Sequence, residues 1–104
     1  LVNADAFKKM KKTAVIVNTA RGPLINEKDL IKALDNNEIG GAGLDVVEIE
    51  PLPANSPLIG RDNVILAPHT AFYSVEALEE LQTKAAADVA NILSGKPAVY
   101  PITG

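Results

Sequence analysis

Residues 14–18 read AVIVN, a short apolar run that ends in a polar side chain. Two further runs of this kind follow, AGLDVV at 42–47 and NVILA at 63–67. Short continuous apolar runs are typical of strands buried on both faces, as in a parallel sheet covered by helices. The glycines of the second run indicate close approach of another backbone or a ligand. The sequence therefore predicts a parallel sheet of about three strands.

Helical patterns stand before, between and after these runs, at 4–10, 27–36 and 75–94. Each begins after a residue that favours the N-cap of a helix, namely Asn3, Asn26 and Ser74. Gly95 and then Pro97 end the last helix, and residues 98–102 are expected to be extended. The order is α-β-α-β-β-α, which is typical of an α/β fold with helices flanking a parallel sheet.

The composition excludes several classes of protein. The chain has 104 residues, is 47% hydrophobic and carries a net charge of −3. No apolar run approaches the roughly 20 residues that span a bilayer, and no basic stripe interleaved with aromatics indicates nucleic-acid binding. The lysines at 8–12 are expected to form a solvated helix end. Without cysteine there are no disulfides or thiolate metal sites, so we expect a cytoplasmic protein without a bound metal.

Polar residues stand where the three predicted strands end. Arg21, Asp45 and His69 are each 24 positions apart, and His69 is the single histidine. If the strands are parallel neighbours, these side chains converge at the carboxyl edge of the sheet, where open α/β sheets bind ligands. Glu50, in a proline-bounded loop, is placed to fold over the same edge. Taken singly, each residue also fits a structural role, as an ion pair, a turn cap, a satisfied histidine or a solvated loop residue.

This group of residue types suits one kind of chemistry. An arginine offers a planar fork of donors that matches a carboxylate, and a histidine exchanges protons near neutral pH. A carboxylate beside the histidine holds one tautomer and favours its protonated form. Such a set fits the reduction of a 2-oxo acid, with histidine as the proton donor. The hydride must come from a cofactor, because no side chain supplies one.

The chain resembles the D-isomer-specific 2-hydroxyacid dehydrogenases. Three ordered motifs carry the resemblance: VNTARGPLINE at 17–27, GAGLDV at 41–46 followed by EP at 50–51, and NVILAPHTA at 63–71. Residues 1–10 and the GKP at 95–97 also match segments of the family, so the resemblance covers essentially the whole chain.

The resemblance implies a role for each motif residue. Arg21 is implied to bind the substrate, His69 to act as general acid/base, and Glu50 to pair with that histidine. Glu48 is a neighbouring carboxylate, but only Glu50 directly precedes a proline. The residues implied to contact an NAD cofactor are Thr19, Ala20, Arg21, Asp45 and His69. Phe72 and Tyr73 favour the D-lactate dehydrogenase branch, or else pack the start of the last helix, and glycerate and phosphoglycerate stay open as substrates.

One part of the family pattern is missing. No G-x-G-x-x-G turn opens a helix after a strand in this chain. We therefore expect residues 1–104 to be a partial NAD-binding domain, the second half of a Rossmann-like fold, from a longer dehydrogenase with a separate substrate domain. Alone it is expected to be inactive, and the whole protein is expected to be a homodimer that acts on a small 2-oxo or 2-hydroxy acid. The alternatives are an NAD-sensing corepressor of the same family and a purely structural domain.

Overall fold

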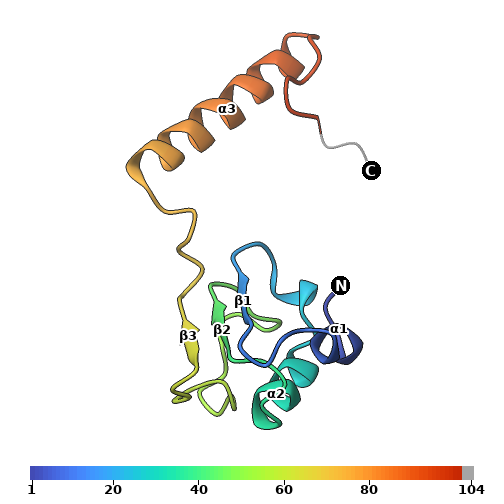
Figure 1. Cartoon of the computed structure of the whole chain (residues 1–104). Helices are drawn as coiled ribbons and strands as arrows, with labels where there is room; N and C mark the ends of the chain where they lie inside the picture. The colour runs from blue at the N-terminus through green and yellow to red at the C-terminus, as the bar shows by residue number, and fades with distance from the viewer. Residues whose placement is uncertain (102–104) are drawn as a thin grey trace. The chain divides into compact units, whose positions relative to one another are not determined.

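The computed structural model describes residues 1–101, which fall into two compact units, one of residues 1–71 and one that begins at Phe72 (Figure 1). The motif residues up to His69 all lie in the first unit.

The first unit is built on a parallel sheet of three strands in the order β1-β2-β3. The strands are β1 (Val15–Asn18), β2 (Gly41–Leu44) and β3 (Val64–Leu66). Ile16 lies opposite Ala42, and Ala42 opposite Val64. This confirms the predicted parallel sheet. The second strand starts one residue earlier and ends three residues earlier than the apolar run at 42–47 indicated.

Close backbone contact at the start of β2 explains one of its glycines. A Cβ at Gly41 would lie 2.6 Å from the carbonyl oxygen of Asn63, so a side chain there would force the backbone before β3 to move. Glycine is the residue that tolerates such an approach.

Two helices and one short 3-10 helix complete the first unit. Helix α1 (Ala4–Lys8) is capped by Asn3, and helix α2 (Glu27–Asp35) is capped by Asn26, whose side chain accepts a hydrogen bond from the Asp29 amide. Both predicted caps are confirmed, and α1 ends about two residues before the predicted boundary. The 3-10 helix η1 (Gly22–Leu24) was not predicted, because Gly22-Pro23 reads as a break in the sequence.

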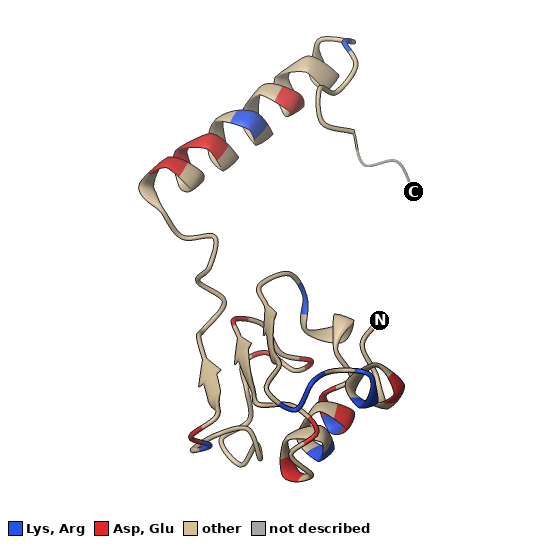
Figure 2. Cartoon of the chain, viewed as in Figure 1, with Lys and Arg blue, Asp and Glu red and all other residues tan. Residues whose placement is uncertain are grey.

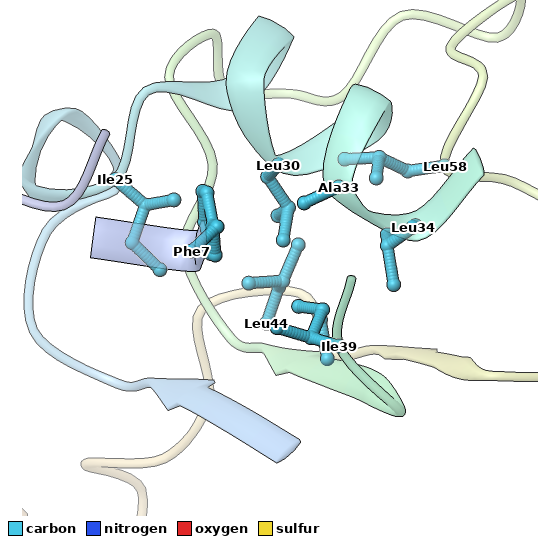
Figure 3. Packing of buried hydrophobic residues seen from close by; sticks show 9 residues of the cluster. Phe7, Ile25, Leu30, Ala33, Leu34, Ile39, Leu44 and Leu58 are labelled. Atoms are coloured by element: carbon cyan, nitrogen blue, oxygen red, sulfur yellow. The ribbon is translucent and has the colours of Figure 1, made fainter. Parts of the chain in front are cut away.

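The core lies on one face of the sheet, where side chains from both helices meet those of the strands (Figure 3). The buried cluster consists of Phe7, Ile25, Leu30, Ala33, Leu34, Ile39, Ala42, Leu44 and Leu58. Leu30, Ala33 and Leu34 give α2 one apolar side, as the helical spacing predicted.

The opposite face of the sheet is exposed. Val15, Val17 and Ile65 point away from the core and are 65%, 67% and 76% exposed. The prediction that these strands are buried on both faces is therefore wrong for the described residues. The apolar runs supply side chains for two faces, but the buried cluster takes its strand residues from one face only.

The second unit consists of the long helix α3 (Val75–Leu93) and the chain that follows it. Ser74 caps its start by accepting a hydrogen bond from the Ala77 amide, and Gly95 follows its end with a φ of +75°, as the sequence predicted. Residues 99 and 100 form a bend instead of an extended segment, because the Asp88 carboxylate accepts hydrogen bonds from both of their amides. Ile102, also predicted to be extended, lies outside the described residues.

Charged residues lie on the helices and loops, while the three strands carry none (Figure 2). Within residues 1–101, no helix combines the length and the apolar character needed to cross a bilayer.

Candidate functional site

His69 lies three residues beyond the end of β3, in an unusual backbone conformation. Its φ is +57°, in the left-handed region that is costly for a residue with a side chain. The His69 amide donates a hydrogen bond of 2.8 Å to the Asp45 carbonyl oxygen, which follows β2. The chain therefore turns sharply after β3 and is tied to the end of the neighbouring strand.

The imidazole of His69 meets the carboxylate of Glu50. Nδ1 of His69 lies 2.7 Å from Oε2 of Glu50, and both side chains are about two-fifths exposed, 41% and 38%. The second oxygen, Oε1, accepts a hydrogen bond of 3.1 Å from the Val47 amide. Because an ionised carboxylate only accepts, Nδ1 is the nitrogen that carries the proton in this contact.

The surroundings of Glu50 lower the pKa of its carboxyl below the ordinary value of 4.5. The largest cause is the hydrogen bond with His69, followed by the hydrogen bond from the Val47 amide. The charges of His69 and Arg21 act in the same direction. Glu50 is therefore ionised throughout the neutral pH range and faces the imidazole as an anion.

The neighbouring carboxylate, Glu48, has a different task. Its Oε1 accepts a hydrogen bond of 2.9 Å from the Glu27 amide, in the first turn of α2. Oε2 of Glu27 in turn accepts one of 3.3 Å from the Glu48 amide. Glu48 thus ties its loop to the start of a helix, where negative charge is favourable. The structure brings Glu50, and not Glu48, to the histidine.

Arg21 is exposed and directly precedes η1. Its Nη1 donates a hydrogen bond of 2.7 Å to the carbonyl oxygen of Ala20. Next to it, Gly22 packs against the loop that leads to Glu50, since a Cβ on Gly22 would lie only 1.9 Å from the Val47 carbonyl oxygen. This contact holds the arginine loop beside the carboxylate loop, which agrees with the effect of the Arg21 charge on Glu50.

Two hollows flank this edge of the first unit. One has a volume of about 320 Å³, includes Asp45, Glu50 and His69, and is otherwise apolar, with Val47, Pro51, Leu52, Leu66, Ala67 and Pro68. The other has a volume of about 270 Å³ and lies over the exposed sheet face, with Thr19, Asp45 and Thr70 above Val17, Gly43 and Ile65. Arg21 is among the lining residues of neither hollow.

Three residues predicted to contact a cofactor lie around the loops at this edge. Thr19 lines the hollow over the exposed sheet face, and Ala20 follows it in the loop after β1. Asp45 also lines this hollow, but it is buried, and its carboxylate accepts hydrogen bonds from the Thr70 and Ala71 amides. Among residues 1–101, no group of three or more histidine, cysteine or acidic side chains is placed to hold a metal ion.

Sequence reasoning missed one residue of the site. Asn18, the last residue of β1, is buried, and its side chain bonds to the backbone of Ala20 and Arg21. The available signal was a polar side chain at the end of an apolar run, directly before the loop that carries the arginine. Asparagine commonly forms such local bonds to the backbone.

Residues 1–71 match the model of a protein family. That family is described as "D-isomer specific 2-hydroxyacid dehydrogenase, NAD binding domain". This chain belongs to that family. Its fold is that of part of a Rossmann-like NAD-binding domain, as the sequence predicted. The matched residues contain both members of the Glu50–His69 pair, and also Arg21.

Individual relatives agree with the family. The chain is 48% identical over 96 residues to a glyoxylate reductase of Thermofilum pendens, covering 92% of this chain and 28% of that protein. It is 46% identical over 94 residues to a D-lactate dehydrogenase of Lactiplantibacillus plantarum, covering 78% of this chain and 28% of that protein. The chain thus spans between a quarter and a third of the length of these curated relatives.

A solved structure shows the same fold. The chain matches an NADPH-dependent glyoxylate/hydroxypyruvate reductase from Sinorhizobium meliloti, solved in complex with NADP and malonate. The TM-score is 0.89 and the identity 34%, over 98% of this chain and 32% of that structure.

Proposed function

We propose that this chain provides the acid/base pair and the substrate-binding arginine of a nicotinamide-dependent 2-hydroxyacid dehydrogenase. The reaction is the reversible reduction of a 2-oxo acid to a D-2-hydroxy acid. One observation carries the proposal. In this member of the family, the single histidine, His69, lies at the carboxyl edge of a parallel sheet, 2.7 Å from the ionised carboxylate of Glu50. Because the chain spans only part of its relatives, we propose that it acts as a portion of a longer enzyme.

The chemistry follows from the two ring nitrogens of His69. Nδ1 donates to Glu50, so Nε2 of the protonated imidazole gives its proton to the 2-oxo oxygen during reduction and takes it back during oxidation. The Glu50 anion stabilises the imidazolium and holds the ring in one tautomer. The guanidinium of Arg21 binds the carboxylate of the acid with two parallel hydrogen bonds.

The hollow over the exposed sheet face suits a nicotinamide ring. Its floor is apolar, with Val17, Gly43 and Ile65, and Thr19 and Asp45 stand at its rim. When bound, the nicotinamide gives or takes the hydride at the carbon that bears the oxygen. We propose NAD as the cofactor and Thr19, Ala20 and Asp45 as the residues that bind it. Arg21 and His69 are proposed to lie beside its reacting ring through the substrate, so they contribute little to cofactor affinity. The NADP bound to the Sinorhizobium reductase makes NADPH the competing choice to test.

The substrate proposed is a 2-oxo acid with a short side chain. The relatives named above are a glyoxylate reductase, a D-lactate dehydrogenase and a glyoxylate/hydroxypyruvate reductase, so glyoxylate, pyruvate and hydroxypyruvate are the acids to compare. The preference for the D-lactate branch stays a prediction. Its two aromatic residues, Phe72 and Tyr73, pack edge to face on each other with ring centres 5.7 Å apart, before α3.

The test uses the full-length enzyme that contains this chain. Steady-state reduction of the three acids is followed with NADH and with NADPH, for the wild type and for Arg21→Gln. Loss of the bidentate contact is expected to raise KM for the acid with a small change in KM for the cofactor. Arg61→Gln is the matched control, because Arg61 pairs with Asp35 near the opposite ends of the strands. Turnover of none of the acids, or equal effects of the two arginine variants, would contradict the proposal.

A further inference from the structure

The two buried polar side chains of the described residues stand side by side at the carboxyl ends of β1 and β2. Asn18 is 6% exposed and Asp45 is 7% exposed. The amide of Asp45 donates a hydrogen bond of 3.0 Å to the Asn18 carbonyl oxygen, so their backbones are linked directly. Burial of polar side chains is costly unless hydrogen bonds compensate for it, which makes the partners of these two residues informative.

Within the described residues, the side chain of Asn18 forms hydrogen bonds only with the loop that carries Arg21. Its Oδ1 accepts a hydrogen bond of 3.1 Å from the Ala20 amide. Its Nδ2 donates one of 2.9 Å to the Arg21 carbonyl oxygen. The amide therefore holds the loop on both sides of the peptide bond between Ala20 and Arg21, and fixes the direction in which the arginine leaves the sheet.

Asp45 does the same for the loop that carries His69. Its two carboxylate oxygens accept hydrogen bonds of 2.8 Å and 2.9 Å from the Thr70 and Ala71 amides. Its carbonyl oxygen accepts the bond of 2.8 Å from the His69 amide. Three successive amides are thus directed at one residue, and they hold His69 at its positive φ of 57°.

We propose that Asn18 and Asp45 form one positioning frame, which sets the loop of Arg21 and the loop of His69 relative to each other. The inference rests on the proposed function, because it assumes that the arginine binds the acid and the histidine exchanges the proton. The link between the Asp45 amide and the Asn18 carbonyl makes the frame a unit. In this assignment Asp45 acts on the histidine loop through the backbone, in addition to its place at the rim of the cofactor hollow.

The frame predicts different kinetic effects for its two halves. Asn18→Ala frees the arginine loop, so KM for the 2-oxo acid rises while KM for NADH changes little. Asp45→Asn keeps the shape of the side chain but turns its NH2 group toward a backbone amide of the histidine loop, which is also a donor. The histidine loop therefore shifts, and kcat falls. Misplacement of a reacting group by about 1 Å costs up to about a hundredfold in rate, so losses of about tenfold to a hundredfold in kcat/KM are expected.

Conservative replacement separates positioning from mere folding. Asn18→Asp keeps the size of the side chain and an acceptor for the Ala20 amide, but it turns a carboxylate oxygen toward the Arg21 carbonyl oxygen. It is therefore expected to raise KM for the 2-oxo acid although it leaves the packing unchanged. The double variant Asn18→Ala/Asp45→Asn is expected to lose less than the product of the two single losses, because contacting residues of one network are not additive. The exposed residues Asn36 and Asp62 provide the matched controls, Asn36→Ala and Asp62→Asn.

The experiment measures kcat and both KM values for these variants in the full-length enzyme, at a temperature where circular dichroism shows each to be folded. Arg21→Gln and His69→Ala serve as benchmarks: if neither reduces turnover, the proposed function fails together with the inference. If both benchmarks lose activity but Asn18→Ala and Asp45→Asn lower only the melting temperature, the frame is structural and the inference is overturned. A rise in KM for NADH that exceeds every other effect in Asp45→Asn also overturns it, since Asp45 would then act as a cofactor contact alone.

Discussion

At the scale of single residues, the hydrogen bond between His69 and Glu50 decides how the edge of the sheet responds to pH. The bond lowers the pKa of the Glu50 carboxyl in the folded chain below its ordinary value. The folded state therefore binds this proton less readily than the unfolded state. The stabilisation from the pair is present above the ordinary carboxyl pKa and is lost as the pH falls through the folded pKa.

The first prediction concerns the titration of Glu50. In His69→Ala, the pKa of the Glu50 carboxyl is expected to rise toward 4.5, because its largest lowering contact is gone. In Arg21→Gln the rise is expected to be smaller, because the Arg21 charge is the smallest of the causes that lower the pKa of Glu50. Carbon NMR of the side-chain carboxyl during an acid titration measures both shifts. An unchanged titration of Glu50 in His69→Ala would show that the pair does not persist in solution.

The second prediction concerns the packing of Gly22. Gly22→Ala places a methyl group 1.9 Å from the Val47 carbonyl oxygen, which is backbone and cannot swing away. Forcing an added group into packed structure costs about 1–3 kcal/mol, and a loss of this size in the free energy of unfolding is expected. Urea denaturation measures it. Gly43→Ala is the matched control, because its new methyl would meet the Val17 side chain at 3.6 Å, an ordinary contact. Equal losses in the two variants would contradict the close approach at Gly22.

Single residues also show where sequence reasoning reached its limit. Glu50 was separated from Glu48 by the proline that follows it, and the contact with His69 agrees with that choice. For Asn18 the sequence predicts only the end of a strand. Its hydrogen-bond partners depend on the turn that follows, and composition does not specify that turn. The same holds for the bonds that the Asp45 carboxylate accepts from the Thr70 and Ala71 amides, which join residues 25 and 26 positions apart.

At the scale of elements, helix starts were the features most directly predicted. Asn3, Asn26 and Ser74 all cap helices through bonds to an amide three residues ahead, an interaction that is local in sequence. Strand ends were less accurate, because β2 stops at Leu44 while the apolar run continues. An apolar run does not say which segments cover each face of the sheet, so the pattern alone does not assign the exposed face.

The third prediction concerns the cap of α2. Asn26→Ala removes the side-chain oxygen that accepts the Asp29 amide at 3.0 Å. Loss of such a cap costs about 1 kcal/mol of stability, and α2 contributes three residues to the core, so the whole first unit is expected to be destabilised by this amount. Chemical denaturation of the chain measures the change. Asn36→Ala, at the other end of α2, is expected to cost clearly less, and the reverse order would argue against the cap.

At the scale of the whole molecule, the exposed sheet face supports the expectation of self-association. Val15 and Val17 on β1 and Ile65 on β3 lie on the same exposed face of the sheet, on either side of β2. Apolar surfaces of this kind are commonly covered by another part of a protein or by a partner. The homodimer and the cytoplasmic location both stay predictions. The family and the fold, in contrast, follow from the three ordered motifs and are confirmed.

The fourth prediction tests this surface in the 104-residue chain. Val17→Lys places a charge on the exposed face and is expected to reduce self-association at high concentration. Analytical ultracentrifugation across a concentration series measures the change. Ile49→Lys is the control, because Ile49 is similarly exposed, at 66%, but lies in the loop before Glu50. A wild-type chain that stays monomeric throughout the series would contradict the expectation.

The central claim is that His69 exchanges the proton while a hydride moves between a nicotinamide and a 2-oxo acid. The most direct measurement follows NADH consumption by the full-length enzyme with glyoxylate, pyruvate and hydroxypyruvate, for the wild type and for His69→Ala, with NADH affinity measured separately. The wild type is expected to turn over at least one acid, and His69→Ala is expected to lose about a hundredfold or more in kcat with NADH affinity nearly unchanged. Equal turnover by the two proteins, or tight NADH binding by the wild type with no turnover of any acid, would contradict the central claim.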